Sequence, residues 1–458
     1  MSKKKILVLS HTSELVGGAE RSIIEVFDIL HKKYGIEPEF ILREPLGTMV
    51  NALKKRGWKY YSLPYGFWSE SKMPTNPEEK YKRSLMNAKA VIEVEGIIKH
   101  SNPDAVLTNS VVCPWAAVAA NFLNVPHIWF VREYGDLDHG RVFELGREAT
   151  FQDVGNSSEL VIANSTSLAS HVAQFVPVSK ITTLYHPFNI NKLLRAADAD
   201  YTNPFKLPKS LKTVIIAGSI TATKGHLEAV EAIGKLNTDD YSAELAIVGH
   251  KGSVEYMNAI AKIISKYDIA DKVHFLGQVK NDQVLALIKS ADVGITGSKK
   301  EAFGRLTFEY IALGKPVVGT NSGATPEMVH DGNNGYLYKY KDETSLYKAL
   351  LRYAKKPNLI KEHGDASVQI AQKMLKGPNN IDALAKKILR VPGSAVDKQD
   401  SMPLHFSRQW LLWLIESEDY IQAMRNESLK RVAKKAIKTR LDRANRRVKS
   451  FARRVLHK

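Results

Sequence analysis

Two glutamates, Glu301 and Glu309, lie eight residues apart in the stretch KKEAFGRLTFEYIALGKPVVGTNSG. If FGRLTFEYIAL begins a helix, the first backbone N–H groups, near Gly304 to Thr307, have no partner within that helix and can bind an anion. Glu309 would then lie about one turn inside the helix, and Glu301 in the loop before it. Carboxylate oxygens accept hydrogen bonds from hydroxyl groups. The stretch therefore combines an anion site with two acids that can bind hydroxyls.

Two further features supply groups that an anionic ligand needs. Lys224 lies between a strand-like run and a helical stretch, where its ammonium can neutralise developing negative charge. Gly17 and Gly18 permit a tight turn and close backbone approach after the first strand-like run. The complete GxGxxG dinucleotide fingerprint is absent, which disfavours a nicotinamide-dependent enzyme. We identify no Asp-x-Asp motif near a strand end that would hold a divalent ion, and expect no metal.

The elements that must position these residues alternate along the chain. Short β-branched runs, each followed by a helical stretch, are KILVLS, AVLTNS, HIWFVRE, LVIANS, TVIIAGS, ELAIVG, VHFLG, VGITGS and PVVGT. This alternation predicts parallel sheets of βαβ units, whose ligands bind beyond the carboxyl ends of the strands. A chain of 458 residues exceeds one hydrophobic core, and a lysine-rich, proline-punctuated segment at 186–212 interrupts the rhythm. We predict domains at 1–190 and 191–390, and a linker and tail at 391–458.

The segment from Ser298 to Leu337 resembles the retaining family-4 glycosyltransferases of the GT-B fold. It shares with them two acids separated by seven residues with Phe-Gly after the first, a GKPVV strand, a Gly-x-x-Pro-Glu turn ending at Glu327, and an Asn-Gly loop. IAGSITATKG resembles the loop that opens their second domain, and HTSELVGGAERS the glycine loop after their first strand. The resemblance covers about residues 5 to 390. It implies two Rossmann-like domains with parallel sheets that face a central cleft.

The resemblance also implies an activity and a set of site residues. The protein would be a metal-independent enzyme of the hexosyltransferase type, which moves a sugar from a nucleotide diphosphate sugar to an acceptor hydroxyl with retention and needs no cofactor. The implied catalytic residues are Glu301 at the sugar, Lys224 at the diphosphate, and Arg132. The implied donor-binding residues are Gly218, Ser219, Lys224, Glu301, Phe303, Gly304, Arg305, Leu306, Thr307 and, at the ribose, Glu309. The implied acceptor or phosphate loop residues are Gly17, Gly18 and Glu133.

The sequence departs from the family at two places. Many relatives carry an arginine where this chain has Ser219, so Arg305 becomes the first candidate for the missing phosphate cation. Arg132 and Glu133 replace the His-Asp or His-Glu pair that commonly ends a first-domain strand, and a buried ion pair is an equally good interpretation of them. These departures leave open a non-catalytic scaffold or partner subunit with a glycosyltransferase fold. Glu327, at the end of the Gly-x-x-Pro-Glu turn, could cap a helix rather than bind a ligand.

The excess positive charge of the chain is concentrated in the C-terminal tail. Of a net charge of +18, residues 421–458 carry +12, from 14 Lys and Arg against two acids. Apolar residues recur there at helical spacing, which favours an amphipathic helix on an anionic membrane surface over nucleic-acid binding, with packing on the protein or another subunit as the alternative. A single cysteine, Cys113, and no spanning segment favour a cytoplasmic protein peripherally bound to the inner face of the plasma membrane. This location fits polysaccharide or cell-envelope biosynthesis on a glycan or lipid-linked acceptor. The oligomeric state stays open.

Overall fold

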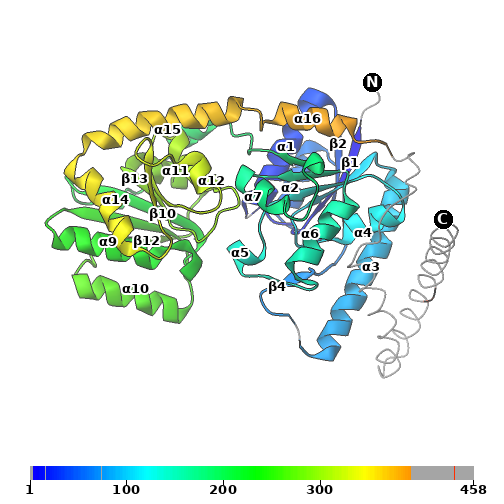
Figure 1. Ribbon diagram of the computed structural model, residues 1–458, viewed down its shortest axis with the longest axis horizontal. Coiled ribbons are helices and arrows are strands. Elements are labelled where there is room, and N and C mark those ends of the chain that lie inside the picture. The colour runs from blue at the N-terminus through cyan, green and yellow to red at the C-terminus, as the bar shows by residue number, and fades with distance from the viewer. Residues whose placement is uncertain (1–3, 16, 74, 394–437, 439–458) are drawn as a thin grey trace.

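The computed structural model describes residues 4–15, 17–73, 75–393 and 438, and shows two α/β lobes joined by two crossing segments (Figure 1). The predicted membrane-binding helix at 421–458 lies outside the described residues except for Lys438. In the part of the chain that the structure describes, no helix is both long enough and apolar enough to cross a lipid bilayer.

The first lobe is built on a seven-stranded parallel sheet in the order β3-β2-β1-β5-β6-β8-β9. Its strands are β1 (Lys5–Ser10), β2 (Glu37–Leu42), β3 (Tyr60–Ser62), β5 (Ala105–Asn109), β6 (His127–Val131), β8 (Leu160–Ala163) and β9 (Ile181–Thr183). Its helices are α1 (Gly18–Tyr34), α2 (Thr48–Arg56), α3 (Pro77–Ser101), α4 (Trp115–Phe122), α5 (Asp136–His139), α6 (Gly146–Ser157) and α7 (Thr166–Val172). A small antiparallel pair, β4 (Ser69–Glu70) and β7 (Val142–Phe143), lies outside this sheet.

The second lobe contains a six-stranded parallel sheet in the order β12-β11-β10-β13-β14-β15. Its strands are β10 (Leu211–Ser219), β11 (Ala243–His250), β12 (Val273–Gly277), β13 (Val293–Thr296), β14 (Val317–Thr320) and β15 (Gly335–Tyr338). The helices that follow the crossover are α8 (Ile190–Ala196), α9 (His226–Thr238), α10 (Val254–Tyr267), α11 (Asn281–Ser290), α12 (Arg305–Ala312), α13 (Thr325–Met328), α14 (Glu343–Lys355), α15 (Asn358–Lys376) and α16 (Ile381–Arg390).

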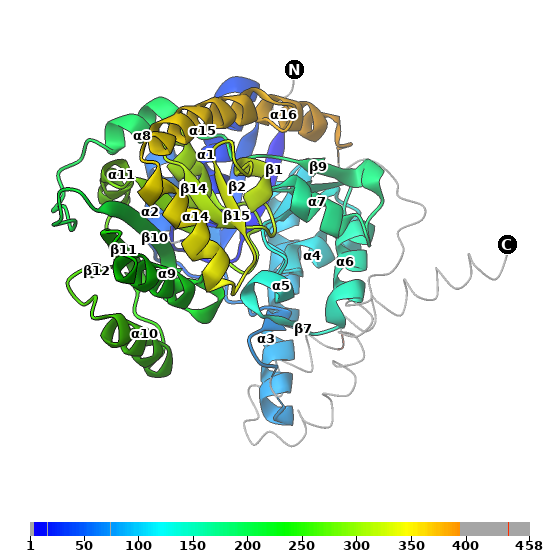
Figure 2. The same cartoon turned by 60° about the vertical axis from the view of Figure 1, so that its left-hand side comes forward.

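Each sheet is buried on both faces, which explains why its strands are apolar runs rather than alternating ones. In β1, Ile6 and Val8 belong to one hydrophobic cluster, and Leu7 and Leu9 to the cluster on the other face. The second sheet is likewise enclosed by two clusters. Figure 2 shows helices on both sides of the sheets. The predicted architecture of two Rossmann-like domains with parallel sheets is confirmed.

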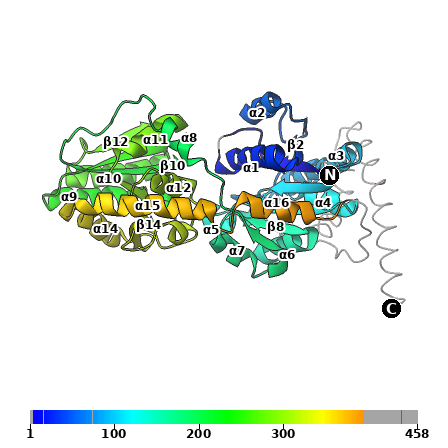
Figure 3. The same cartoon turned by 90° about the horizontal axis from the view of Figure 1, so that it is seen from above.

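The chain crosses between the lobes twice. At the first crossing, Leu184 packs in the first lobe, whereas Phe188 and α8 pack in the second, close to the boundary expected from the sequence. At the second, α15 ends and α16 continues over the first lobe, as the view from above shows (Figure 3). Leu384 and Ile388 of α16 join the first lobe's core. By packing, α16 therefore belongs with the first domain, although the sequence places it at the end of the second.

Candidate active site

A cavity of about 270 Å³ lies between the two domains and is lined by residues from both. The first domain contributes residues that follow β6 and β8 and the start of α1, and the second contributes residues that end β10 and β13 and begin α12. The carboxyl ends of parallel strands thus meet at one place, where ligands of such sheets bind.

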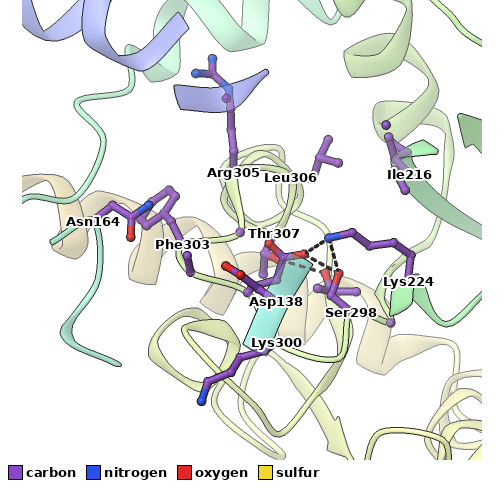
Figure 4. Close-up of a pocket in the computed structure, with 18 of the residues that line it drawn as sticks. Asp138, Asn164, Ile216, Lys224, Ser298, Lys300, Phe303, Arg305, Leu306 and Thr307 are labelled. Atoms are coloured by element: carbon purple, nitrogen blue, oxygen red, sulfur yellow. Dashed lines mark hydrogen bonds and ion pairs between the residues drawn. The ribbon is translucent and has the colours of Figure 1, made fainter. Parts of the chain in front are cut away.

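Lys224 and Glu301 come together because their loops follow neighbouring strands, β10 and β13. The Lys224 ammonium donates to Glu301 Oε1 at 2.9 Å and to Ser298 Oγ at 3.1 Å, and Ser298 Oγ also donates to Glu301 (Figure 4). A backbone bond from Lys299 N–H to Thr223 C=O, at 2.8 Å, ties the two loops together. The structure therefore places the two predicted catalytic residues of the second domain in direct contact.

Two glycines allow this close approach of loops. Gly225 has a φ of +74°, and a Cβ there would lie 2.6 Å from the carbonyl oxygen of Gly297. Gly323 has a φ of +60°, and a Cβ there would lie 2.3 Å from the carbonyl oxygen of Glu301. Only glycine combines this backbone conformation with such short contacts. The glycines of the TKG and NSG sequences thus hold Lys224 and Glu301 in place.

Glu301 is ionised in this arrangement. Burial raises its pKa, but the Lys224 ammonium and the Ser298 hydroxyl outweigh this effect, and the net pKa lies below the ordinary value. Its side chain is still 22% exposed, and it lines the cavity. A carboxylate that remains accessible in a cavity can accept hydrogen bonds from ligand hydroxyls.

The start of α12 has the free backbone N–H groups that were expected there. Gly304, with a φ of +83°, precedes α12, and Phe308 N–H is the first to donate back, to Gly304 C=O. The N–H groups of Arg305, Leu306 and Thr307 therefore have no intrahelical acceptor. Phe303 through Thr307 all line the cavity, as does Gly218 at the end of β10. The helix dipole favours an anion at this position.

Glu309 occupies a different environment from Glu301. It is 2% exposed and does not line the cavity, and Arg305 Nε donates to its Oε1 at 3.1 Å. Burial raises the pKa of Glu309, and the Arg305 guanidinium only partly offsets this. Arg305 thus both lines the cavity and holds Glu309. The contact of Glu309 with a ribose, which the resemblance implies, stays a prediction.

Arg305 also bridges the two domains. Its Nη1 lies 3.3 Å from Glu25 Oε2 on α1 and 3.2 Å from His186 Nε2 at the first crossing, and its guanidinium lies 4.9 Å from the centre of the Phe188 ring. Glu25 also contacts His186 Nε2 at 2.6 Å. Although burial raises the pKa of Glu25, His186 and Arg305 lower it to about 2. The predicted phosphate cation is therefore held by carboxylates of both domains.

Replacement of Arg305 by alanine should weaken binding of a nucleoside diphosphate about tenfold, because a charge-assisted hydrogen bond to the phosphate is lost. The matched control is Glu25→Gln, which removes the interdomain ion pair but keeps Arg305. If Arg305 binds phosphate, Glu25→Gln should retain or improve the affinity measured by titration calorimetry. Equal losses in the two variants would instead make Arg305 a domain contact only.

The two polar residues that directly follow β6, Arg132 and Glu133, form most of their contacts within the first domain. Arg132 Nε donates to Asn109 Oδ1 and its Nη1 to Ser22 Oγ, both at 2.8 Å, while its buried Nη2 has no partner among the described residues. Burial lowers the pKa of Arg132 to about 9 against the opposing effect of Glu133, so Arg132 stays charged at neutral pH. Arg132 lines the cavity.

The remaining predicted residues lie at or behind the cavity wall. Glu133 accepts hydrogen bonds from Ser110 Oγ and from Val111 N–H, and it is not among the described lining residues. Gly18 begins α1 and lines the cavity, whereas Gly17 precedes the helix. Ser219 is exposed at the end of β10 and does not line the cavity. The structure therefore brings Gly18 and Arg132, but not Glu133, Gly17 or Ser219, into the cavity wall.

Sequence reasoning missed several lining residues, among them Asp138, His139, Asn164, Ser298 and Lys300. Asn164 directly follows β8, and Ser298 lies two residues after the end of β13, so the rule about strand ends could have found them. Asp136 and Asp138 form an Asp-x-Asp pair in α5, shortly after β6, whereas we identified no such motif near a strand end from the sequence. Among the described residues, no group of three or more His, Cys, Asp or Glu is arranged to hold a metal ion.

Glu327 caps a helix, but one in the other domain. Its Oε2 accepts from Thr166 N–H at 3.0 Å and its Oε1 from Ser167 N–H at 2.7 Å, at the start of α7. Tyr185 at the first crossing donates to Oε2 at 2.7 Å. A carboxylate at a helix N-terminus is stabilised by the free N–H groups and the dipole. Glu327 therefore fastens the second domain to the first beside the cavity.

We expect Glu327→Gln to speed hydrogen exchange at the Thr166 and Ser167 amides and to lower the free energy of unfolding by about 1 to 2 kcal/mol, since an amide oxygen is a weaker acceptor than a carboxylate. Exchange measured by mass spectrometry on peptides covering α7 checks the local effect. Glu343→Gln, at the half-buried start of α14, is the matched control. Unchanged exchange at α7 would show that this contact does not hold the domains together.

Two family descriptions match the chain, one for each domain. The Glycosyltransferase Family 4 description matches residues 16–192, and the Glycosyl transferases group 1 description matches residues 199–373. Their boundary coincides with the first crossing between the lobes. Together they include the glycine loop, the Lys224 loop and the two glutamates.

Curated relatives match in part. An N-acetyl-alpha-D-glucosaminyl L-malate synthase of Bacillus anthracis is 28% identical over 209 residues, which are 45% of this chain and 53% of that protein. A D-inositol 3-phosphate glycosyltransferase of Streptomyces griseus is 27% identical over 239 residues, which are 47% of this chain and 51% of that protein. The chain thus spans about half the length of the curated relatives it matches.

Solved structures share the fold over most of the chain. A glycosyltransferase of Rickettsia africae superposes with a TM-score of 0.65 at 22% identity, covering 85% of this chain and 98% of that one. HepE of Anabaena, in complex with UDP and glucose, gives 0.62 at 18% identity, covering 84% and 98%. The two parallel-sheet domains, the cavity between them and the two matching family descriptions all indicate the same family. The chain belongs to the family-4 glycosyltransferases of the GT-B fold, and its second domain is a group 1 glycosyl transferase domain.

Proposed function

We propose that the protein transfers a sugar from a nucleoside diphosphate sugar to an acceptor hydroxyl with retention of anomeric configuration. The observation that carries this proposal is the contact of Lys224 and Glu301 beside the start of α12, in a cavity between two domains. The helix start and Lys224 suit a diphosphate, and Glu301 suits sugar hydroxyls. The glycosyltransferase names of the relatives, and the UDP and UDP-glucose in complexes of the Anabaena structure, support the same donor class.

In the proposed reaction, the bond between the sugar's anomeric carbon and the diphosphate oxygen breaks, and a bond from that carbon to the acceptor oxygen forms on the same face. The acceptor's proton passes to the departing phosphate oxygen. Negative charge grows on the diphosphate as the bond breaks, and the Lys224 ammonium and the N–H groups at the start of α12 can stabilise it. Glu301 holds the sugar through its hydroxyls. We assign this reaction to the hexosyltransferase type, and no metal ion takes part in it.

The test is a donor screen on the purified chain. UDP, GDP and dTDP are first titrated by calorimetry, and the sugars of the tightest-binding base are then assayed for nucleotide release. The proposal expects one diphosphate to bind and at least one of its sugars to release nucleotide. If none of the three diphosphates binds and none of their sugars releases nucleotide, the enzyme proposal fails.

A non-catalytic scaffold is the second candidate, and the Arg305 contacts favour it. Arg305 is held by Glu309, Glu25 and His186, and Glu309 does not line the cavity. A scaffold would bind nucleotide weakly or not at all and would release none. The same donor screen therefore separates the two candidates.

For the acceptor, we propose a lipid-linked or growing glycan at the cytoplasmic face of the membrane, in polysaccharide or cell-envelope biosynthesis. The support is the sequence of residues 421–458, with 14 basic residues against two acids and a helical apolar period. Deletion of these residues should lower the membrane-bound fraction in cell fractionation. High salt should also lower the membrane-bound fraction of the full chain, because screening weakens the attraction to anionic lipid. An unchanged membrane-bound fraction after deletion would contradict this location.

A further inference from the structure

One acid on the first-domain wall of the cavity has an unused oxygen. Asp138 lies in α5, and its side chain is 5% exposed. Its Oδ2 accepts from Tyr134 N–H at 2.8 Å and lies 3.9 Å from His139 Nε2, whereas its Oδ1 is buried and has no hydrogen-bond partner among the described residues. A buried carboxylate oxygen without a donor is costly. Figure 4 shows the Asp138 side chain projecting into the cavity that Phe303 and Thr307 also line.

The loop that carries Asp138 is firmly held. Gly135 has a φ of +83°, and a Cβ there would lie 2.3 Å from the Phe143 ring, so the turn needs glycine. Asp136 forms an ion pair with Arg147, and Tyr134 Oη bonds to Ser167 Oγ at 2.7 Å. These contacts on both sides of Asp138 fix its direction. The unpaired Oδ1 of Asp138 therefore lies in a part of the cavity wall that these contacts hold in place.

The chemistry of the wall narrows the class of ligand. Asp138 and Glu301 are the acids among the described lining residues, whereas four permanent cations, Lys224, Lys300, Arg132 and Arg305, line the same cavity, which disfavours a cationic ligand. A second buried acceptor without a donor, Asn164 Oδ1, also belongs to a lining residue. Two such acceptors require two donors, and a neutral polyhydroxylated compound supplies them without adding charge.

We propose that Asp138 Oδ1 binds a hydroxyl of a polyhydroxylated acceptor, with Asn164 Oδ1 receiving a second hydroxyl. This inference rests on the proposed function, because it assigns the acceptor side of the same cavity. It moves the acceptor-binding acid from Glu133, which accepts from Ser110 and Val111 through Oε1 and does not line the cavity, to Asp138 in the next helix. A simple apolar alcohol would leave one of the two oxygens unpaired and should bind poorly.

The test uses Asp138→Asn on the full chain. The amide keeps an oxygen for Tyr134 N–H and places an NH₂ group where Oδ1 accepted, so a ligand hydroxyl loses its bond to a charged oxygen and can only accept from the amide, with little change of shape. Glu148→Gln, at an exposed acid of α6 outside the lining residues, is the matched control. Saturation-transfer NMR with myo-inositol, glycerol and n-butanol is measured in the presence of the nucleoside diphosphate that binds tightest.

The wild-type chain should bind myo-inositol or glycerol and not n-butanol. Asp138→Asn should weaken polyol binding about tenfold, while Glu148→Gln leaves it unchanged and both variants bind the nucleotide within about twofold of wild type. The inference is overturned if Asp138→Asn binds the polyols as wild type does, or if the nucleotide-bound wild type binds neither polyol. Failure of the proposed function is a separate result, namely no nucleotide release from any donor, and the polyol titrations stand independently of it.

Discussion

Replacement of Lys224 by alanine should lower the rate of nucleotide release from the donor sugar about 10²- to 10³-fold, the usual effect of removing a group that stabilises developing negative charge. Lys224 Nζ lies 2.9 Å from Glu301 Oε1 and lines the cavity at the start of α12. Its loss also leaves the Glu301 carboxylate without its cation, which should raise the pKa of Glu301 towards and above the ordinary value. Steady-state nucleotide release is the measurement.

Two variants accompany this experiment. Lys224→Arg keeps the positive charge and should recover part of the rate, since the effect is electrostatic. Lys299→Ala removes an exposed lysine from the Glu301 loop that does not line the cavity, and it should behave as wild type. A rate for Lys224→Ala within threefold of that for Lys299→Ala would mean that Lys224 takes no part in catalysis.

Replacement of Glu301 by glutamine should separate sugar binding from nucleotide binding. The proposal places the Glu301 carboxylate on the sugar, so the affinity for the nucleoside diphosphate alone should stay within about twofold of wild type. The affinity for the nucleotide sugar should fall about 10- to 100-fold, which corresponds to losing a hydrogen bond to a charged group worth about 1.5 to 3 kcal/mol. Calorimetric titration with both ligands measures the difference. Equal effects on the two ligands would move Glu301 away from the sugar.

Lys224→Ala provides the contrast for this result. Because the ammonium is proposed to act on the diphosphate, its loss should weaken both ligands together. The two residues are in contact, so their effects should not add, and the double variant should resemble the more severe single one. Additive losses would mean that the contact between them has no functional weight.

Much of the fold was predictable because buried parallel strands are apolar runs that end in small polar residues. All nine runs expected as strands coincide with strands of the two main sheets. β2, β3, β9 and β15 were missed: β3 and β9 are only three residues long, and β15 begins at the glycine of the Asn-Gly sequence, which was expected to be a loop. The position of α16 on the first domain was not predictable from periodicity, which fixes a buried face but not its partner.

The candidate site, like the fold, was predictable only in part. The contact of Lys224 with Glu301 followed from two strand ends, since β10 and β13 are neighbours. The contacts of Arg305 with Glu25, and of Glu327 with α7, depend on how the two domains meet, which no local pattern encodes. Asp138 was missed because it lies in a short helix beyond the strand end rather than at it.

The most direct test of the central claim is a crystal structure of the chain with the nucleoside diphosphate that binds tightest. The account predicts the diphosphate at the N–H groups of Arg305 to Thr307, with Lys224 Nζ within hydrogen-bond distance of a phosphate oxygen. It also predicts that Arg305 has left Glu309, so that the ribose hydroxyls reach that carboxylate. A nucleotide bound elsewhere, or a cavity without nucleotide at saturating concentration, would contradict the account.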